Sequence, residues 1–405
     1  MIIDQSQARR VHVREERLAY LDRFLAKAAE DQINPSIVVC AARGNTEIFR
    51  GAYGVAAPGG PPLAEDMIAD VASVTKTFVA AMIMILQEDG QLLLWDRLRE
   101  YFPEFVGENK HEVTLFHLLT HSSGMDDDDT EKYVKNIMKR LLRLPMPADG
   151  APEDQWNRVW NEAAARLGYD ARQAPSGAQY GFFEAIGLGA PLKYRPGARF
   201  DYSNMGYRLL ARIVEDVSGE NLDDFARRRI FEPLGMKDSH FILPREKWSR
   251  VVKRAESCRG SNWYNSDENR AAFSGSSGLK TTAPDMLRFT RMILGLGTLD
   301  GARILSPASV RAMTADYNAA LPREFWKGRW LGANWGFGWN IRADKLDDLG
   351  VLRSPRAVDH CGYGGARMLA DPEYGLAAAF YLVDQLEDDY ILHAKITNIL
   401  YSALD

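Results

Sequence analysis

The chain has 405 residues, of which 46% are hydrophobic and 26% are charged, a composition typical of a globular protein with a large buried core. Its formal net charge is −5 and no long lysine- or arginine-rich run occurs, which argues against nucleic acid and anionic membranes as partners. The three cysteines are widely spaced and form no Cys-x-x-Cys pair, which indicates neither a disulfide framework nor a zinc site.

The N-terminal segment, residues 1–10, lacks the apolar core of a signal peptide. No later segment is apolar over the about 20 residues that a membrane-spanning helix requires. We therefore expect a cytoplasmic protein without a membrane segment.

The first elements predicted along the chain are a helix and a hairpin. Apolar side chains at helical spacing predict an amphipathic helix over residues 16–30. Two strands follow, over 36–42 and 47–51, and Gly44-Asn45 forms the turn between them. A helix followed by a hairpin is typical of the start of an α/β layer.

A Ser-x-x-Lys pattern opens the most apolar stretch of the chain. Ser73 and Lys76 precede an uninterrupted apolar run from Phe78 to Leu86, which predicts a buried helix because no proline interrupts it and Gly90 ends it. The i,i+3 spacing places the serine hydroxyl and the lysine amine on one helix face. Because burial lowers the pKa of an amine, Lys76 is a candidate base for a Ser73 nucleophile.

This pattern alone is weak evidence, since two common residue types at one spacing recur by chance. A second copy, Ser277 to Lys280, lies in a glycine-rich segment that favours a loop or the start of a strand. The structural alternative for Ser73 is a serine in a first helical turn beside a lysine whose amine reaches solvent. Further motifs are needed to decide between the two.

The middle of the chain is predicted to be mainly helical and includes an irregular insertion. A short helix capped by Thr114 and closed near Gly124 carries His117 and His121, a possible metal-ligand spacing, but no acidic partner accompanies them and we expect no metal. The acidic run 126–129 is typical of a solvated loop. The segment from about 126 to 190 is the least regular part, and it is either a substrate wall or lid, or a surface decoration.

Two further motifs follow. Tyr202 and Asn204 form the single Tyr-x-Asn pattern of the chain, in the loop that begins another predicted helix. Beyond residue 275 the sequence becomes strand-like, over 335–339, around His360, and over 375–383. The structural alternatives are a buried tyrosine, a capping asparagine and a histidine at a strand end.

Together, Ser73-x-x-Lys76, Tyr202-x-Asn204 and His360-x-Gly362 resemble the three active-site elements of the serine β-lactamase and penicillin-binding-protein superfamily, most closely its class C, esterase and D-aminopeptidase branch. The resemblance extends from about residue 35 to 385, without the insertion. Its supporting stretches are Leu115 to Gly124, Pro196 to Asn204, Phe231 to Met236 and Ser277 to Asp285.

The resemblance implies an α/β (α+β) fold of the β-lactamase/transpeptidase type, with an antiparallel sheet flanked by helices and a mainly helical subdomain. A single catalytic domain would combine an α/β part, about residues 1–70 and 275–405, with a helical part, about 71–274. The active site would lie in the cleft between these two parts.

The resemblance also implies roles for the motif residues. Ser73 would attack a substrate carbonyl to form an acyl-enzyme, with Lys76 and Tyr202 sharing its proton. The backbone N–H groups of Ser73 and Tyr363 would form the oxyanion hole. Asn204 would hold an acyl-side carbonyl or orient Lys76, and Tyr202 would protonate the leaving group.

His360 departs from the Lys-Thr-Gly of β-lactamases. Because an imidazole with a pKa near 6.5 is not a permanent cation, we expect weak recognition of a substrate carboxylate. We therefore predict a serine hydrolase without a cofactor, a carboxylesterase or amidase that takes a small-molecule acyl substrate, either a small ester or a D-configured or cyclic amide. A D-aminopeptidase or β-lactamase, an acyltransferase or peptide cyclase, and a non-catalytic binding protein remain alternatives, and the oligomeric state is open.

Overall fold

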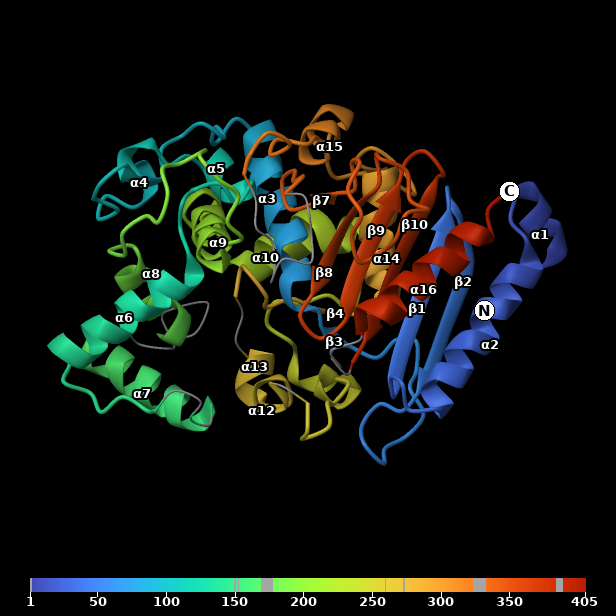
Figure 1. Cartoon of the computed structure of the whole chain (residues 1–405), viewed down its shortest axis with the longest axis horizontal. Coiled ribbons are helices and arrows are strands. Elements are labelled where there is room, and N and C mark those ends of the chain that lie inside the picture. Colours follow the sequence, from blue (N-terminus) through green and yellow to red (C-terminus); the bar gives the residue numbers. More distant parts are fainter. Residues whose placement is uncertain are drawn as a thin grey trace.

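A six-stranded antiparallel sheet with the order β2-β1-β10-β9-β8-β7 organises the computed structural model (Figure 1). The structure describes residues 2–148, 151, 153–168, 178–258, 260–271, 274–322, 333–383 and 389–405. The strands of this sheet are β1 (Ser36–Arg43), β2 (Thr46–Gly54), β7 (Asn340–Ile341), β8 (Val358–Gly362), β9 (Ala366–Asp371) and β10 (Leu376–Leu382). The sheet therefore joins segments from the two ends of the chain.

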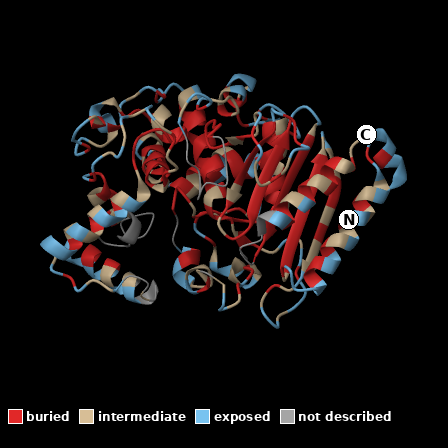
Figure 2. Ribbon diagram, in the orientation of Figure 1, coloured by how far each residue is buried: buried red, intermediate tan, exposed pale blue. Residues whose placement is uncertain are grey.

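Helices cover both faces of the sheet because its central strands are apolar on both sides. Along β1, Ile37 and Val39 face one core, and the alternating Val38 and Cys40 face another. The first core includes side chains of α2 (Glu15–Glu30) and α16 (Asp389–Ser402). The second includes α3 (Thr75–Glu88), α9 (Asn204–Ser218) and α14 (Ala283–Leu294). Figure 2 shows the central strands of the sheet as buried along most of their length.

Helix α3 lies at the centre of the second core. Every residue from Thr75 to Leu86 is buried, as expected of a helix that is apolar on all faces. It packs against α9, which places the start of both helices close together. Two-stranded ladders also form, from β3 (Ala69–Asp70) with β4 (Lys280–Thr281) and from β5 (Thr298–Leu299) with β6 (Ala302–Arg303).

The remaining helices lie mostly between residues 98 and 271. They are α4 (Leu98–Tyr101), α5 (Leu115–Leu119), α6 (Asp127–Leu141), α7 (Glu153–Arg166), α8 (Ala178–Gly187), α10 (Leu222–Ala226), α11 (Glu232–Leu234), α12 (Ser261–Tyr264) and α13 (Asp267–Ala271), with α1 (Gln5–Arg10) and α15 (Pro307–Met313) outside this range. The helices α6, α7 and α8 of the insertion share a small core of their own, which includes Val134, Trp160 and Phe182. In the part of the chain that the structure describes, each helix is too short or too polar to cross a membrane.

The predicted fold class is confirmed, as are the helix over 16–30 and the first two strands. The strand predicted over 335–339 is wrong. Gly338 has a φ of +76°, and a Cβ there would lie 3.1 Å from the Lys76 carbonyl oxygen, so this loop turns to approach α3 closely. The helix predicted up to Gly124 ends earlier, because His121 adopts a left-handed φ of +54°.

Candidate active site

Ser73 lies in a 3₁₀ turn, Ala72–Val74, immediately before α3. Asp70 Oδ1 accepts a hydrogen bond of 2.9 Å from the Ala72 N–H, and Ala72 adopts a left-handed φ of +45°. Such a φ costs about 1–2 kcal/mol for a residue with a Cβ, so this turn is held by its surroundings. The first N–H groups of a helix have no intrahelical acceptor, which makes the Ser73 N–H a candidate donor to a substrate oxyanion.

Lys76 lies one turn further along the chain, with its amine fully buried. Its Nζ is 3.0 Å from Ser73 Oγ, 2.8 Å from Asn204 Oδ1 and 2.8 Å from the Ser276 carbonyl oxygen. The last two atoms only accept hydrogen bonds, so the two N–H groups of a neutral amine donate to them and its lone pair is left for the Ser73 hydroxyl. Burial lowers the pKa of Lys76 to about 7, so the neutral form is accessible near neutral pH.

Tyr202 precedes α9 and lies against the same two side chains. Its hydroxyl is hydrogen-bonded to Ser73, and the Lys76 Nζ lies 4.8 Å from the centre of its ring. Burial raises the pKa of Tyr202 well above its usual value, so the phenol keeps its proton. A protonated phenol at this position can donate to a leaving group.

The acidic run 126–129 is not the solvated loop that the sequence suggested. Asp126 caps α6 by accepting the Asp129 N–H at 2.8 Å, and Asp127 is the first residue of the helix. Carboxylates are favoured at helix N-termini by the helix dipole, which explains the run. The Asp127 carboxylate also reaches the start of α9, where it accepts the Asn204 Nδ2–H at 2.8 Å.

His360 lies on β8 and is only 2% exposed. Its Nδ1 is 2.7 Å from the Cys361 carbonyl oxygen, which must accept, so the proton is on Nδ1 and Nε2 carries a lone pair. Burial, together with the Lys76 charge, lowers the pKa of His360 to about 3. The imidazole is therefore neutral throughout the physiological range, a stronger loss of charge than an ordinary histidine pKa implies.

Gly362 ends β8 beside the Ser73 turn, and Tyr363 follows it. A Cβ on Gly362 would lie 2.0 Å from the Val71 carbonyl oxygen, so only glycine allows the strand to approach this closely. The Tyr363 ring stacks on Tyr264, with 6.4 Å between the ring centres. The close approach brings the backbone of Tyr363 next to the turn that carries Ser73.

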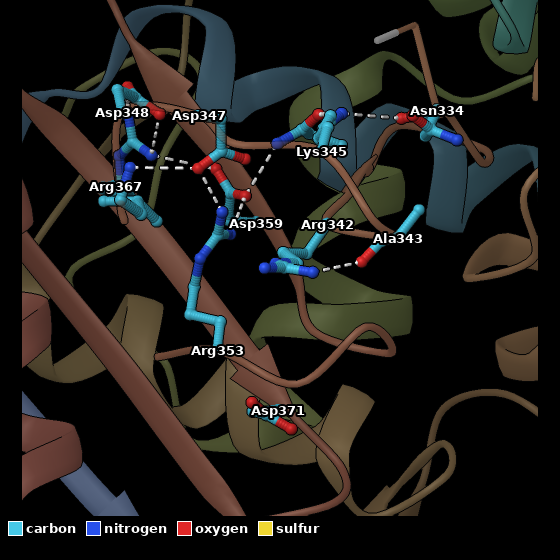
Figure 3. Close-up of polar contacts among 12 residues, drawn as sticks. Asn334, Arg342, Ala343, Lys345, Asp347, Asp348, Arg353, Asp359, Arg367 and Asp371 are labelled. Atoms are coloured by element: carbon cyan, nitrogen blue, oxygen red, sulfur yellow. Dashed lines mark hydrogen bonds and ion pairs between the residues drawn. The ribbon is translucent and has the colours of Figure 1, made fainter. Parts of the chain in front are cut away.

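A buried ion network holds the other side of β8 (Figure 3). Asp359, the neighbour of His360, accepts from Arg353 at 2.8 Å and from Arg367 at 3.0 Å. It also accepts from Asn340 of β7 at 2.8 Å. Since successive side chains of a strand point to opposite faces, these contacts fix β8 without occupying the His360 side.

A cavity of about 660 Å³ opens above these groups. The predicted site residues that line it are Ser73, Tyr202, Asn204, His360, Gly362 and Tyr363, with Lys76 beneath Ser73. The first turn of α6 lines it as well, so the insertion forms part of its wall. The structure thus brings together all of the predicted site residues at one cavity of a size typical of small-molecule sites.

The two histidines at metal-ligand spacing have structural contacts instead. His117 forms a reciprocal cap with Thr114 at the start of α5. His121 Nδ1 accepts the Ser203 N–H at 3.1 Å, and its ring lies 4.3 Å from that of Tyr202. His117 therefore caps a helix, and His121 packs against the site residue Tyr202.

Comparison with known proteins identifies the family. Residues 21–395 match the family model described as Beta-lactamase. The chain belongs to the beta-lactamase family. This beta-lactamase family member is 28% identical over 312 residues to Protein Rv1367c of Mycobacterium tuberculosis, with 68% of this chain and 67% of that protein covered.

Two other relatives have functional names. The chain is 29% identical over 257 residues to the D-alanyl-D-alanine-carboxypeptidase/endopeptidase AmpH of Escherichia coli, covering 62% of this chain and 55% of that protein. It is 28% identical over 231 residues to esterase EstB of Burkholderia gladioli, covering 55% and 51%. The family therefore includes more than one activity, and membership alone leaves the substrate open.

Solved structures share the fold. A penicillin-binding protein homolog from Caulobacter crescentus superposes with a TM-score of 0.70 at 21% identity, covering 97% of this chain and 99% of that one. EstCE1, described as a hydrolase with promiscuous acyltransferase activity, superposes with a TM-score of 0.69 at 19% identity, covering 95% and 99%. At such identities the similarity concerns the fold.

The sequence analysis missed two contributors to this site. Asp127 had a usable signal, because an acidic residue directly before an amphipathic stretch indicates a helix N-terminus. The Ser276 carbonyl had none, because every residue carries a backbone oxygen and this one lies 200 positions from Lys76 in the chain.

Proposed function

We propose that this beta-lactamase family member is an esterase-like serine hydrolase that forms an acyl-enzyme on Ser73. Its substrate is a small ester or a D-configured or cyclic amide. The observation that carries the proposal is the buried Lys76 amine, 3.0 Å from Ser73 Oγ and bonded otherwise only to acceptors. This arrangement suits a neutral amine that takes the serine proton.

The reaction follows from these positions. As Ser73 Oγ bonds to the substrate carbonyl carbon, its proton passes to Lys76, and the oxyanion accepts from the N–H groups of Ser73 and Tyr363. Tyr202 gives its phenolic proton to the leaving group as that bond breaks, and regains one from Lys76. Water then repeats the sequence in reverse, so that its oxygen bonds to the acyl carbon and Ser73 recovers its proton.

The environment of His360 favours a neutral substrate over one with a carboxylate. A buried imidazole with a pKa of about 3 cannot pair with an anion, whereas its Nε2 lone pair can accept a substrate N–H or O–H. This supports the esterase over a β-lactamase, whose substrates carry a carboxylate, and leaves the D-aminopeptidase alternative open because such an enzyme binds a free amino terminus. The name of EstB supports the same activity, and the name of AmpH supports the peptidase alternative.

Intact-protein mass spectrometry after brief exposure to a chromogenic short-chain ester, with product release read in parallel, tests this function. A chromogenic cephalosporin and an added alcohol acceptor form two further arms. We expect rapid ester turnover through a transient acyl adduct and little opened cephalosporin. A lasting cephalosporin adduct would favour a peptidase-like site, transfer to the alcohol an acyltransferase, and no adduct in any arm a non-catalytic protein.

Replacing the neutral histidine by a cation is expected to shift specificity. The His360→Lys variant places an ammonium in the cavity, which should raise the ratio of penicillin turnover to neutral-ester turnover, because the penicillin carboxylate then has a partner. The ratio of the two kcat/KM values measures the effect. An unchanged ratio in a folded variant would count against a role for His360 in substrate recognition.

A further inference from the structure

The Asp127 carboxylate lies behind Asn204, on the side away from Lys76. Its Oδ2 accepts from Asn204 N and from Asn204 Nδ2, both at 2.8 Å. Its Oδ1 accepts from Met205 N at 3.1 Å and from Ser203 Oγ at 3.2 Å. One carboxylate from α6 therefore binds three consecutive residues at the start of α9.

We propose that Asp127 is a positioning residue for the reaction, which orients the Asn204 amide and through it the amine of Lys76 toward Ser73. The proposal rests on the function proposed above. It assigns a role to the first turn of the insertion, for which the sequence motifs gave none.

The orientation of the amide is the geometric basis. An asparagine presents an acceptor on one side and two donors on the other. Because Asp127 only accepts, it holds the Nδ2 side, and Oδ1 is left facing Lys76 Nζ at 2.8 Å. A reversed amide would place donors against Lys76 and remove one of the two acceptors that direct its lone pair at Ser73.

Capping of α9 alone does not account for Asp127. Ser203 is already the N-cap of this helix, since its Oγ accepts the Gly206 N–H at 3.3 Å. The bond from Asp127 to Asn204 Nδ2 satisfies no backbone group of the helix. The helix dipole at the same time favours a negative charge at this position.

The charge of Asp127 also acts on Lys76. Burial is the main cause that lowers the pKa of Lys76 to about 7, and the charge of Arg208 on α9 lowers this pKa too. Asp127 on α6 and Cys361 on β8 have the opposite effect and raise the pKa of Lys76. Among the described residues, the other groups near the amine are uncharged. They are the phenol rings of Tyr202 and Tyr207 and the imidazoles of His121 and His360, and burial and the Lys76 charge lower the pKa of both imidazoles. Removing the Asp127 charge therefore lowers the pKa of Lys76 further.

The test measures how fast a fluorophosphonate labels Ser73 as a function of pH, by intact mass, in the full chain. This probe needs an activated serine but not the natural substrate. In the wild type the rate should rise with pH through about 7, as Lys76 loses its proton. In Asp127→Asn we expect a maximal rate lower by about 10-fold to 10²-fold, because Lys76 is misplaced, and a rise that occurs at lower pH.

Two variants separate positioning from net charge and stability. Asp129→Asn removes the same charge from the same helical turn, but Asp129 faces Lys132 at 3.3 Å instead of α9, so its profile should match the wild type. Asp127→Glu keeps the charge, so its labelling rate should rise at the same pH as in the wild type, but the maximal labelling rate should be lower. Circular dichroism verifies the fold of each variant.

Three outcomes decide the matter. If Asp127→Asn matches Asp129→Asn in rate and pH profile, the positioning role is wrong. If wild-type Ser73 is not labelled at any pH, the proposed function fails instead. If Asp127→Asn does not fold, Asp127→Ser replaces it, because a serine hydroxyl can still cap α9 but carries no charge. A wild-type labelling rate and pH profile in Asp127→Ser would overturn the positioning role of Asp127.

Discussion

Replacing Ser73 with alanine is expected to lower kcat for a chromogenic short-chain ester by about 10⁴-fold to 10⁶-fold and to abolish the acyl adduct. The reason is that Ser73 supplies the hydroxyl bonded to the Lys76 amine, while Asn204 and Ser276 offer this amine only an amide oxygen and a backbone carbonyl oxygen. The fold should persist, because the change removes one oxygen atom from a partly exposed side chain. Steady-state rates, intact mass and thermal melting measure the three effects.

The second Ser-x-x-Lys copy supplies the matched control. Lys280 donates to the Phe241 carbonyl oxygen at 3.1 Å and lies on β4, so it does not pair with Ser277 as Lys76 pairs with Ser73. The Ser277→Ala variant should still form the acyl-enzyme. Ester turnover at the wild-type rate in Ser73→Ala would disprove the assignment of the nucleophile.

Replacing Gly362 with alanine is expected to have the second largest effect. The new Cβ would lie 2.0 Å from the Val71 carbonyl oxygen and 3.4 Å from Ala72 Cβ, and a backbone oxygen cannot move aside as a flexible side chain can. Such overpacking costs about 1–3 kcal/mol of unfolding free energy. Displacing β8 also moves the Tyr363 N–H away from the oxyanion position, and a shift of about 1 Å can cost about 10²-fold in rate.

Melting temperature and ester kcat together measure the Gly362→Ala effect. Gly206→Ala is its control, because Gly206 is also buried but a Cβ there would make an ordinary contact of 3.6 Å with Leu118. Alanine is also the better helix former in α9. If Gly362→Ala kept the wild-type kcat and melting temperature, the close approach of β8 to the Ser73 turn would not be required.

The buried ion network behind β8 explains how Gly362 is kept so close to the Val71 carbonyl oxygen and the Ser73 turn. Asp359 joins Arg353 of the loop before β8, Arg367 of β9 and Asn340 of β7. Buried ion pairs contribute little net stability, but breaking one leaves an unpaired charge, so they restrict the strand to one position (Figure 3). The network therefore holds the strand that carries His360 and Gly362 against the turn that carries Ser73.

Much of the fold could be predicted from local sequence patterns. The apolar run of β1, the apolar run of α3 and the start of α9 after Tyr202 are each visible in a short stretch of neighbouring residues. Several helices of the last third of the chain were not predicted, among them α14, α15 and α16. The loop over 335–339 also escaped prediction, because its path depends on the packing of Gly338 against α3.

For the site, the sequence by itself determined that Ser73 and Lys76 share a face, since a spacing of three residues in a helix does so regardless of what surrounds it. Only the tertiary structure decided the protonation state of Lys76 and the direction of its lone pair. The pKa of Lys76 and the neutrality of His360 depend on burial by distant segments. The direction of the Lys76 lone pair depends on Asn204 and on the Ser276 carbonyl, which folding alone brings to the amine.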